Sequence, residues 1–274
     1  MRSNDQETFK NQVIAHMGKY LGQNNELDGK KGADGYPHVL NLMQVLQYNF
    51  LPQYRAQLVQ YVDRNRIKMH SEAHHLNSSQ VMCMNFFFPL MDSKLYYILN
   101  LINSNEQWEN PKGQFEKISD KDNQKRGATN FDFYIETDNG RKVYMEIKYT
   151  EDDFGKAKRD KAHREKWEVI YKPLLKTSQL VNEETITEDD FYENYQLLRN
   201  ISHAQTNSDY VVFLVPKETL YERAEKFINK VVKSEALDHV RVISWEEAFD
   251  AVKNDPQLAD YYAEFEKKYL DIKK

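Results

Sequence analysis

Three observations predict an α/β fold in which helices flank a small sheet. Residues 129–137 and 142–150 alternate between apolar and polar side chains, which is the two-residue period of a β-strand. Segments before and after them carry apolar residues at helical spacing, and two short apolar runs near residues 208–216 and 239–244 interrupt the later helices. The predicted order of elements is therefore α, βββ, α, β, α, β, α.

The composition is that of one folded domain in a reducing compartment. The 274 residues exceed an average domain, but mixed α/β domains reach this length, and 40% hydrophobic residues suffice for a core. The only cysteine, Cys83, lies in the apolar run "VMCMNFFFPL", which favours a small buried side chain over a disulfide or metal ligand. No apolar run approaches the roughly 20 residues that cross a bilayer, and the first ten residues lack a signal-peptide core. We expect a single cytoplasmic domain over residues 1–274 without a membrane partner.

The first part of the chain predicts helices and then a meander. Residues 20–36 are rich in Gly, Asn and Asp and predict a loop after a short N-terminal helix. Residues 51–102 have a long helical pattern, interrupted near residues 78–79 and at Pro89. A weak strand at 113–119 joins the two alternating segments in a three-stranded meander.

The second part predicts alternating helices and strands. "TEDDFYENYQLLRNISHA" reads as one helix capped by Thr187, and "SDYVVFLVP" reads as a short buried strand. A helix at about 218–235, the strand "HVRVIS", a helix opened by Ser244 and a last helix after Pro256 follow. His163 and His203 are expected at the surface.

The charge is unevenly distributed around a formal net value of −5. Residues 156–176 hold eight Lys or Arg against three acids, whereas residues 183–193 hold six acids and no base. The basic block, with Lys156, Lys158 and Arg159 at its start, could face a phosphate backbone. A solvated surface explains it equally well.

The two alternating segments carry the residues with candidate chemistry. If their apolar positions, which include Phe131, Phe133 and Ile147, share one face, then Asp132, Glu146 and Lys148 lie on the other. Two carboxylates suit a hard cation such as Mg²⁺, and a neighbouring Lys can orient or deprotonate a water. An acid-x-Lys pattern occurs five times in the chain, but only the one at Glu146 lies on such a strand. A solvent-facing hairpin with a cross-strand ion pair is the alternative.

The length of the hairpin loop decides whether the two acids face each other. A two-residue loop Asn139–Gly140 would set Asp132 against Ile147. A three-residue loop from Asp138 to Gly140 would set Asp132 against Glu146, and Asp-Asn-Gly suits such a loop with Gly140 at positive φ. We predict the three-residue loop, with both carboxylates near enough to share one cation.

At these residues the sequence resembles the PD-(D/E)xK nuclease superfamily, in an uncharacterised bacterial branch. The stretches that carry the resemblance are "HLNSSQVMCMNFFFPL", "QFE", "TNFDFYI", "MEIKYTE" and "QLLRN". It implies a restriction-endonuclease-like αβββαβ core with a mixed sheet at about 68–216, and additional helices at 1–67 and 217–274. It also implies that Asp132 and Glu146 hold Mg²⁺ or Mn²⁺ and that Lys148 is the catalytic lysine. Phe131 stands where the short signature has Pro.

Four further side chains are weaker candidates. The resemblance suggests Glu116 as an upstream acid, although an exposed edge-strand Glu fits equally. Gln196 and Arg199 are three residues apart on one helix and could contact a phosphate. Glu151 could pair with Lys148 or join the outer shell of a metal.

The function expected from these residues is metal-dependent hydrolysis of phosphodiester bonds by a DNA endonuclease. Nucleic acid, most plausibly DNA, is the expected partner, and a homodimer is left open. The alternative is a catalytically inactive protein that keeps the nuclease fold and binds nucleic acid or another partner.

Overall fold

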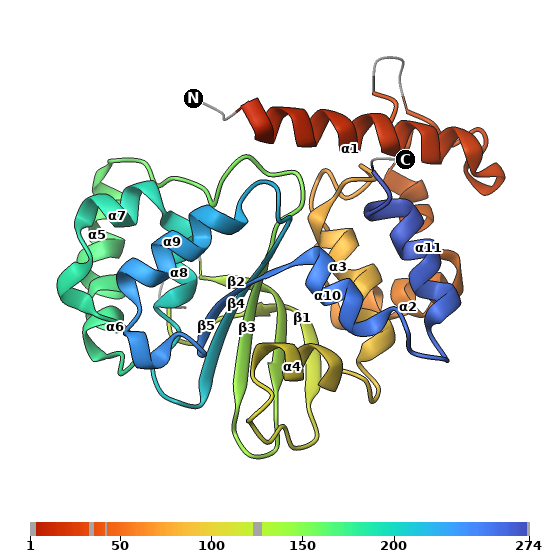
Figure 1. Ribbon diagram of the computed structural model, residues 1–274. Coiled ribbons are helices and arrows are strands. Elements are labelled where there is room, and N and C mark those ends of the chain that lie inside the picture. The colour runs from red at the N-terminus through yellow and green to blue at the C-terminus, as the bar shows by residue number, and fades with distance from the viewer. Residues whose placement is uncertain (1–3, 33–35, 42, 123–127, 273–274) are drawn as a thin grey trace. The chain divides into compact units, whose positions relative to one another are not determined.

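A computed structural model of the chain describes residues 4–32, 36–41, 43–122 and 128–272 (Figure 1). Its contacts divide the chain into two compact units, which we call the helical unit and the sheet unit. The helical unit comprises Met1–Ile98, Ile147–Asp152 and Trp245–Lys274; the sheet unit comprises Leu99–Glu146 and Asp153–Ser244. The single domain expected from the sequence stays a prediction.

The sheet has five strands in the order β1-β2-β3-β4-β5 and is mixed (Figure 1). The first two neighbouring pairs are antiparallel, whereas β4 and β5 are parallel. The strands are β1, Lys112–Ile118; β2, Asn130–Glu136; β3, Lys142–Ile147; β4, Asp209–Val215; and β5, Val240–Ser244. The meander and both later strands predicted from the sequence are confirmed.

The β2–β3 hairpin has the predicted three-residue loop. The Thr137 amide donates to the Arg141 carbonyl at 3.0 Å, and the Gly140 amide donates to the Thr137 carbonyl at 3.0 Å. Gly140 has φ +80°, a backbone conformation that glycine adopts without steric cost. Asp138, Asn139 and Gly140 therefore form the turn, and the register from Glu136 with Lys142 to Phe133 with Met145 is the one that a three-residue loop predicts.

Helices of the sheet unit cover one face of the sheet, where they form a continuous apolar core with it (Figure 1). They are α5, Lys161–Lys166; a π-helical turn, Trp167–Tyr171; α6, Lys172–Thr177; α7, Glu188–Glu193; α8, Tyr195–Ile201; and α9, Tyr221–Val231. The predicted single helix after Thr187 is wrong, because Asn194 has φ −129° and separates α7 from α8. This break lets the amides of Tyr195 and Gln196 donate to the carbonyls of Gly155 and Phe154.

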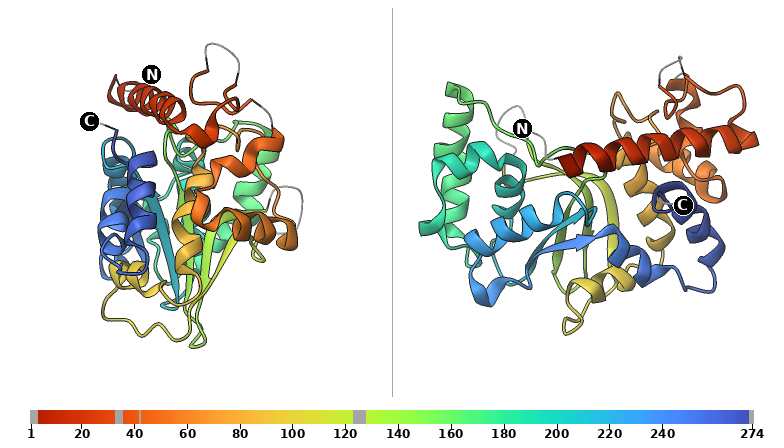
Figure 2. Two further views of the ribbon diagram at one scale, coloured as in Figure 1. Left: turned by 90° about the vertical axis from the view of Figure 1, so that its right-hand side faces the viewer. Right: turned by 45° about the horizontal axis from the view of Figure 1, so that its top comes forward.

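The helical unit contains two long helical segments at the chain ends and a central buried helix (Figure 2). Its α-helices are α1, Asn4–Gln23; α2, Arg55–Asn65; α3, Ser79–Phe87; α10, Trp245–Val252; and α11, Ala259–Tyr269. The chain passes from this unit to the sheet unit within α4, Tyr96–Ile102. Short 3₁₀ helices lie at Asn25–Leu27, Met43–Asn49, Pro52–Tyr54, Phe88–Leu90, Glu183–Thr185 and Ser234–Ala236.

Helix α3 is the centre of the helical unit. Eight of its nine residues, including Cys83, are buried, as the apolar run predicted. The Asn85 side chain accepts from the Leu51 amide at 2.9 Å and donates to the Tyr269 hydroxyl at 2.8 Å, which ties α3 to α11. Of the helices in the described part of the chain, none is long and apolar enough to span a membrane.

Candidate active site

Two of the predicted acids lie on adjacent strands of the sheet unit. The register of β2 and β3 runs from Glu136 with Lys142 to Phe133 with Met145. Asp132 and Glu146 are the next residues along the two strands. The Glu146 side chain is buried, with 4% of its surface exposed, whereas Asp132 is half-buried. Directly opposed residues of an antiparallel pair are near neighbours, so this register supports a shared site.

A third acid, Glu116, continues this row onto β1. The pairs on either side of it are Phe115 with Phe133 and Lys117 with Phe131, so Glu116 lies on β1 beside the part of β2 that holds Asp132. Its φ is +54°, which is uncommon for a residue other than glycine. Such local strain is often found at functional sites. The Asn130 amide group donates a hydrogen bond to the Glu116 carboxylate.

The predicted alternation of β2 is wrong at Phe131. The Phe131 ring lies 4.7 Å from that of Tyr144, in the apolar cluster that also contains Tyr134. The Phe133 ring instead packs on Phe115, with ring centroids 4.9 Å apart. Phe131 and Phe133 therefore do not share a face, and the change falls at Asp132.

A matching change on β1 supplies the physical reason. Phe115 packs on the Phe133 side, whereas the Lys117 ammonium lies 5.6 Å from the centre of the Tyr134 ring. The residue between them is Glu116, whose left-handed backbone redirects the side chains that follow. The irregularity of β1 and β2 thus lies at Glu116 and Asp132. We call Glu116, Asp132 and Glu146, on the three adjacent strands β1, β2 and β3, the acidic row.

Helix α8 places a polar residue against Glu146 that the sequence analysis missed. The Asn200 side chain is fully buried, and its Nδ2 donates to Glu146 Oε2 at 3.0 Å and to the Gln196 carbonyl at 2.9 Å. A signal was present, because Asn200 interrupts the apolar positions Leu197 and Ile201 of "QLLRNI". A buried Asn among such residues needs polar partners.

Arg199, a predicted supporting residue, lies in the electrostatic field of Glu146. Burial by itself lowers the pKa of the guanidinium, but the Glu146 carboxylate and the hydroxyls of Tyr195 and Tyr171 outweigh it, so the pKa is raised. The Arg199 guanidinium lies 5.4 Å from the centre of the Tyr195 ring. Arg199 therefore remains a cation beside the acidic row. Gln196, one turn earlier, packs its side chain against Gly155.

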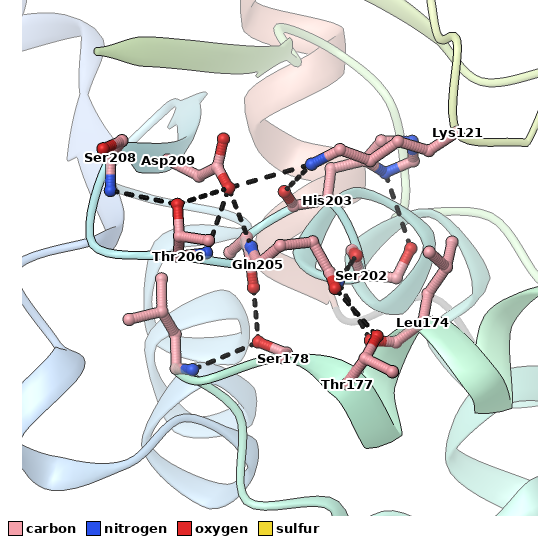
Figure 3. A network of polar contacts seen from close by, with 12 residues as sticks. Lys121, Leu174, Thr177, Ser178, Ser202, His203, Gln205, Thr206, Ser208 and Asp209 are labelled. Atoms are coloured by element: carbon pink, nitrogen blue, oxygen red, sulfur yellow. Dashed lines mark hydrogen bonds and ion pairs between the residues drawn. The ribbon is translucent and has the colours of Figure 1, made fainter. Parts of the chain in front are cut away.

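A polar network holds the segment that follows α8 (Figure 3). His203 Nδ1–H donates to the Arg199 carbonyl at 2.9 Å, so Nε2 accepts from the Ser119 hydroxyl at 2.7 Å. Lys121 donates to the His203 carbonyl at 2.8 Å and lies 3.8 Å from the Asp209 carboxylate (Figure 3). The expectation of a surface His203 is wrong: it is 1% exposed, and burial lowers its pKa to about 4. A neutral His203 thus fixes the end of α8 to the strands.

Lys148 and Glu151 belong to the helical unit. Lys148 is 7% exposed, and its carbonyl accepts from the Trp245 indole at 2.8 Å. Glu151 accepts from the Ser79 hydroxyl and from the Tyr149 amide, both at 2.6 Å. Glu151 also lines a polar cavity of about 630 Å³ in that unit. The position of Lys148 in the candidate site rests on its place in the sequence, two residues after Glu146.

The basic block pairs with the acidic run rather than lying unopposed. Lys156 contacts Glu193 at 2.5 Å, and Arg159 contacts Asp189 at 2.7 Å. Lys158 is exposed and forms no ion pair with any residue that the structure describes. Two segments of opposite charge in the sequence therefore largely neutralise each other in the fold.

The donor set at the acidic row is made of oxygens. Within the described residues, no group of three or more His, Cys, Asp or Glu side chains is arranged to hold a metal ion. Asp132 and Glu146 offer two carboxylates, which is a sufficient protein contribution for Mg²⁺ because this ion keeps several waters. The residues at the row fit a hard divalent cation better than a thiolate- or imidazole-binding one.

Comparison with known proteins identifies the family. The model of a family described as "Restriction Endonuclease associating with ARP" matches residues 6–270. The chain belongs to this restriction endonuclease family. It is therefore a member of the PD-(D/E)xK superfamily, and its mixed five-stranded sheet is consistent with the restriction-endonuclease-like fold. Neither a search of curated proteins nor a search of solved structures gave a match.

Proposed function

We propose that this restriction endonuclease family member hydrolyses phosphodiester bonds in DNA with a divalent cation, Mg²⁺ or Mn²⁺, bound by Asp132 and Glu146. One observation supports the proposal: in a chain of this family, the β2–β3 register runs up to Phe133 with Met145, and Asp132 and Glu146 are the next residues along these adjacent strands. Lys148 follows Glu146 in the Glu-x-Lys pattern and is assigned to the attacking water. Glu116 and Glu151 are proposed as supporting acids.

The environment of Glu146 favours a bound cation. A carboxylate that is only 4% exposed has lost most of its hydration, which is costly unless charges or hydrogen bonds replace it. Asn200 supplies one hydrogen bond and Arg199 supplies a positive charge at longer range. A divalent cation bound by this carboxylate would stabilise negative charge on the phosphate as a Lewis acid.

The proposed reaction is an in-line hydrolysis. Lys148 orients the attacking water, whose oxygen forms the new bond to phosphorus while the bond to the leaving sugar oxygen breaks. One proton of the water is released to a base, and the leaving oxygen takes up a proton. Arg199 and Gln196 on α8 contact nonbridging phosphate oxygens, and Arg199 is suited to this because its guanidinium stays charged.

DNA binding by Lys156, Lys158 and Arg159 remains a proposal as well. Lys156 and Arg159 already pair with acids, so Lys158 is the member of the block that we expect to contribute most to phosphate contacts. Homodimer formation is an untested expectation.

Cleavage assays on matched variants test the proposal. Supercoiled plasmid, linear duplex, single-stranded DNA and RNA are incubated with Mg²⁺ or Mn²⁺. Glu146→Gln and Lys148→Ala should each reduce cleavage by roughly 100-fold or more, while Glu136→Gln and Lys142→Ala on β2 and β3 should cleave normally. Thermal unfolding checks that every variant is folded. If the wild type binds DNA but cleaves none of the four substrates, the inactive binding protein is the better description.

A further inference from the structure

The Asn200 side-chain oxygen is a buried acceptor without a partner among the residues that the structure describes. Asn200 has no exposed surface, and its Oδ1 makes no hydrogen bond to any described residue. Buried polar atoms are rarely left in this state, because the lost hydration is not replaced. An acceptor in this state beside Glu146 is available to a ligand from outside the chain.

The orientation of this amide is fixed by its neighbours. Asn200 Nδ2 is within hydrogen-bond distance of Glu146 Oε2, at 3.0 Å, and of the Gln196 carbonyl, at 2.9 Å. Both neighbours can only accept, so rotating the amide by 180° would set its oxygen against two other oxygens. The unpartnered atom is therefore the oxygen, which is the kind of atom that Mg²⁺ and Mn²⁺ bind.

The same amide joins this oxygen to a proposed cation ligand. Nδ2 and Oδ1 share one carbon atom, and Nδ2 already contacts the Glu146 carboxylate. The two carboxylates proposed to bind the cation, those of Asp132 and Glu146, lie on the adjacent strands β2 and β3. Asn200 Oδ1 would add an amide oxygen to these two carboxylates as a ligand of the cation.

We propose that Asn200 Oδ1 is a further ligand of the divalent cation, beside Asp132 and Glu146. This inference rests on the proposed function, since it assumes a cation at the acidic row. It assigns two tasks to one side chain: Nδ2 orients the Glu146 carboxylate, and Oδ1 binds the cation. A buried water on Oδ1 would also satisfy the atom, but Asn200 would then affect cation affinity only through the Nδ2 hydrogen bond to Glu146.

Titration with Mn²⁺ alone separates these possibilities. The dissociation constant is measured from the electron paramagnetic resonance signal of free Mn²⁺ for wild type, Asn200→Leu and Asn200→Asp. Leu has nearly the shape of Asn without polar atoms, so N200L should bind Mn²⁺ roughly 10-fold to 100-fold more weakly. Asp keeps an oxygen at the position, so N200D should bind at least as tightly as wild type. Ser202→Ala removes a buried hydroxyl from the end of the same helix and should leave the affinity unchanged.

The outcomes distinguish the inference from the proposed function. If N200L binds Mn²⁺ as tightly as wild type does, Asn200 Oδ1 is not a ligand. The same follows if N200L and N200D lose Mn²⁺ affinity equally, because only the Nδ2 hydrogen bond to Glu146 would then matter. If Glu146→Gln binds Mn²⁺ as wild type does, or if wild type does not bind it, the cation site itself is wrong and both proposals fail. Should N200L not fold, Asn200→Ala serves in the same titration.

Thermal unfolding gives an independent readout. In N200D two carboxylates face each other, which should lower the Tm without a cation, because like charges repel. Saturating Mn²⁺ should then raise the Tm of N200D by more than it raises that of wild type. An equal rise in both proteins would count against a cation beside this position.

Discussion

Replacement of Asp190 by alanine tests how firmly α7, the helix before α8, is anchored in the sheet unit. Asp190 completes a capping box at the start of α7: its amide donates to the Thr187 hydroxyl at 3.2 Å, and its carboxylate accepts from the Thr187 amide at 2.9 Å. The carboxylate also contacts the Lys230 ammonium of α9 at 2.6 and 2.7 Å. One side chain therefore caps α7 and ties it to α9.

The expected cost follows from these contacts. Loss of a capping side chain costs about 1 kcal/mol. The pair with Lys230 is stronger than a typical surface pair, because both carboxylate oxygens are used and the Asp190 side chain is only 13% exposed, so it adds about 1 kcal/mol. Asp190→Ala should thus lower the free energy of unfolding by about 2 kcal/mol, measured by urea denaturation at pH 7.

A neighbouring acid provides the control and the refutation. Asp189 lies one residue earlier, and its side chain is 76% exposed while it pairs with Arg159. Asp189→Ala should cost less than about 0.5 kcal/mol, because exposed ion pairs contribute little. If the two variants lose the same stability, the capping and pairing assigned to Asp190 are wrong.

The pH dependence of the Asp190 contribution has a definite sign. Burial raises the pKa of the carboxyl, but the contacts with Lys230 and Thr187 outweigh it, so the folded-state pKa lies below the usual value of 3.8. The unfolded chain therefore binds more protons in this range. The free energy of unfolding of wild type should exceed that of Asp190→Ala by its full amount above about pH 4. The part of this difference that depends on the charged carboxylate should disappear as the pH falls through the folded-state pKa of Asp190.

Three further predictions concern the hairpin, a buried lysine and the basic block. Gly140→Ala should lower the free energy of unfolding, measured by urea denaturation, by about 1 kcal/mol, because φ is +80° at this position. The added methyl group meets no atom within 4 Å, so the backbone conformation alone causes the loss; an unchanged stability would contradict the turn geometry. Burial holds the pKa of Lys268 well below its usual value. The free energy of unfolding of the wild type, relative to that of Lys268→Met, should therefore rise with pH up to about 10.5. A difference between the two proteins that does not change with pH would contradict a lowered pKa of Lys268. DNA affinity is measured by fluorescence anisotropy at several salt concentrations. Lys158→Gln should reduce the slope of log affinity against log salt concentration by about 0.9. Lys156→Gln and Arg159→Gln should reduce it less, because they remove cations that already pair with acids; equal effects of all three would contradict a larger contribution of Lys158.

Local turn chemistry made the hairpin predictable from the sequence. Asp138, Asn139 and Gly140 specify a three-residue loop without reference to the rest of the fold, and the loop then fixes which residues of the two strands oppose each other. The positions of Asp132 and Glu146 in adjacent strands were therefore accessible from the sequence. Their shared binding of a cation stays a prediction.

The features that the sequence did not predict depend on contacts between distant segments. The side-chain direction of Phe131 follows from the left-handed backbone of Glu116, a residue type that seldom adopts it. The start of α8 at Tyr195 depends on the carbonyls of Phe154 and Gly155, about 40 residues earlier. His203 likewise contacts Ser119, which follows β1 and lies 84 residues earlier in the chain. Periodicity in one segment carries no information about such partners.

Three departures from ordinary packing meet along one row of the sheet unit. Glu146 is a charged side chain in a buried position, Asn200 beside it leaves its oxygen without a partner, and Glu116 holds a backbone conformation that costs energy. Stability alone would favour apolar side chains here, because replacing buried polar groups by well-packed apolar ones is often neutral or stabilising. Sequences break such rules mainly where binding or catalysis requires it. In a member of a restriction endonuclease family, the proposed cation at Asp132 and Glu146 would also supply a partner for the Asn200 oxygen, which has none among the described residues.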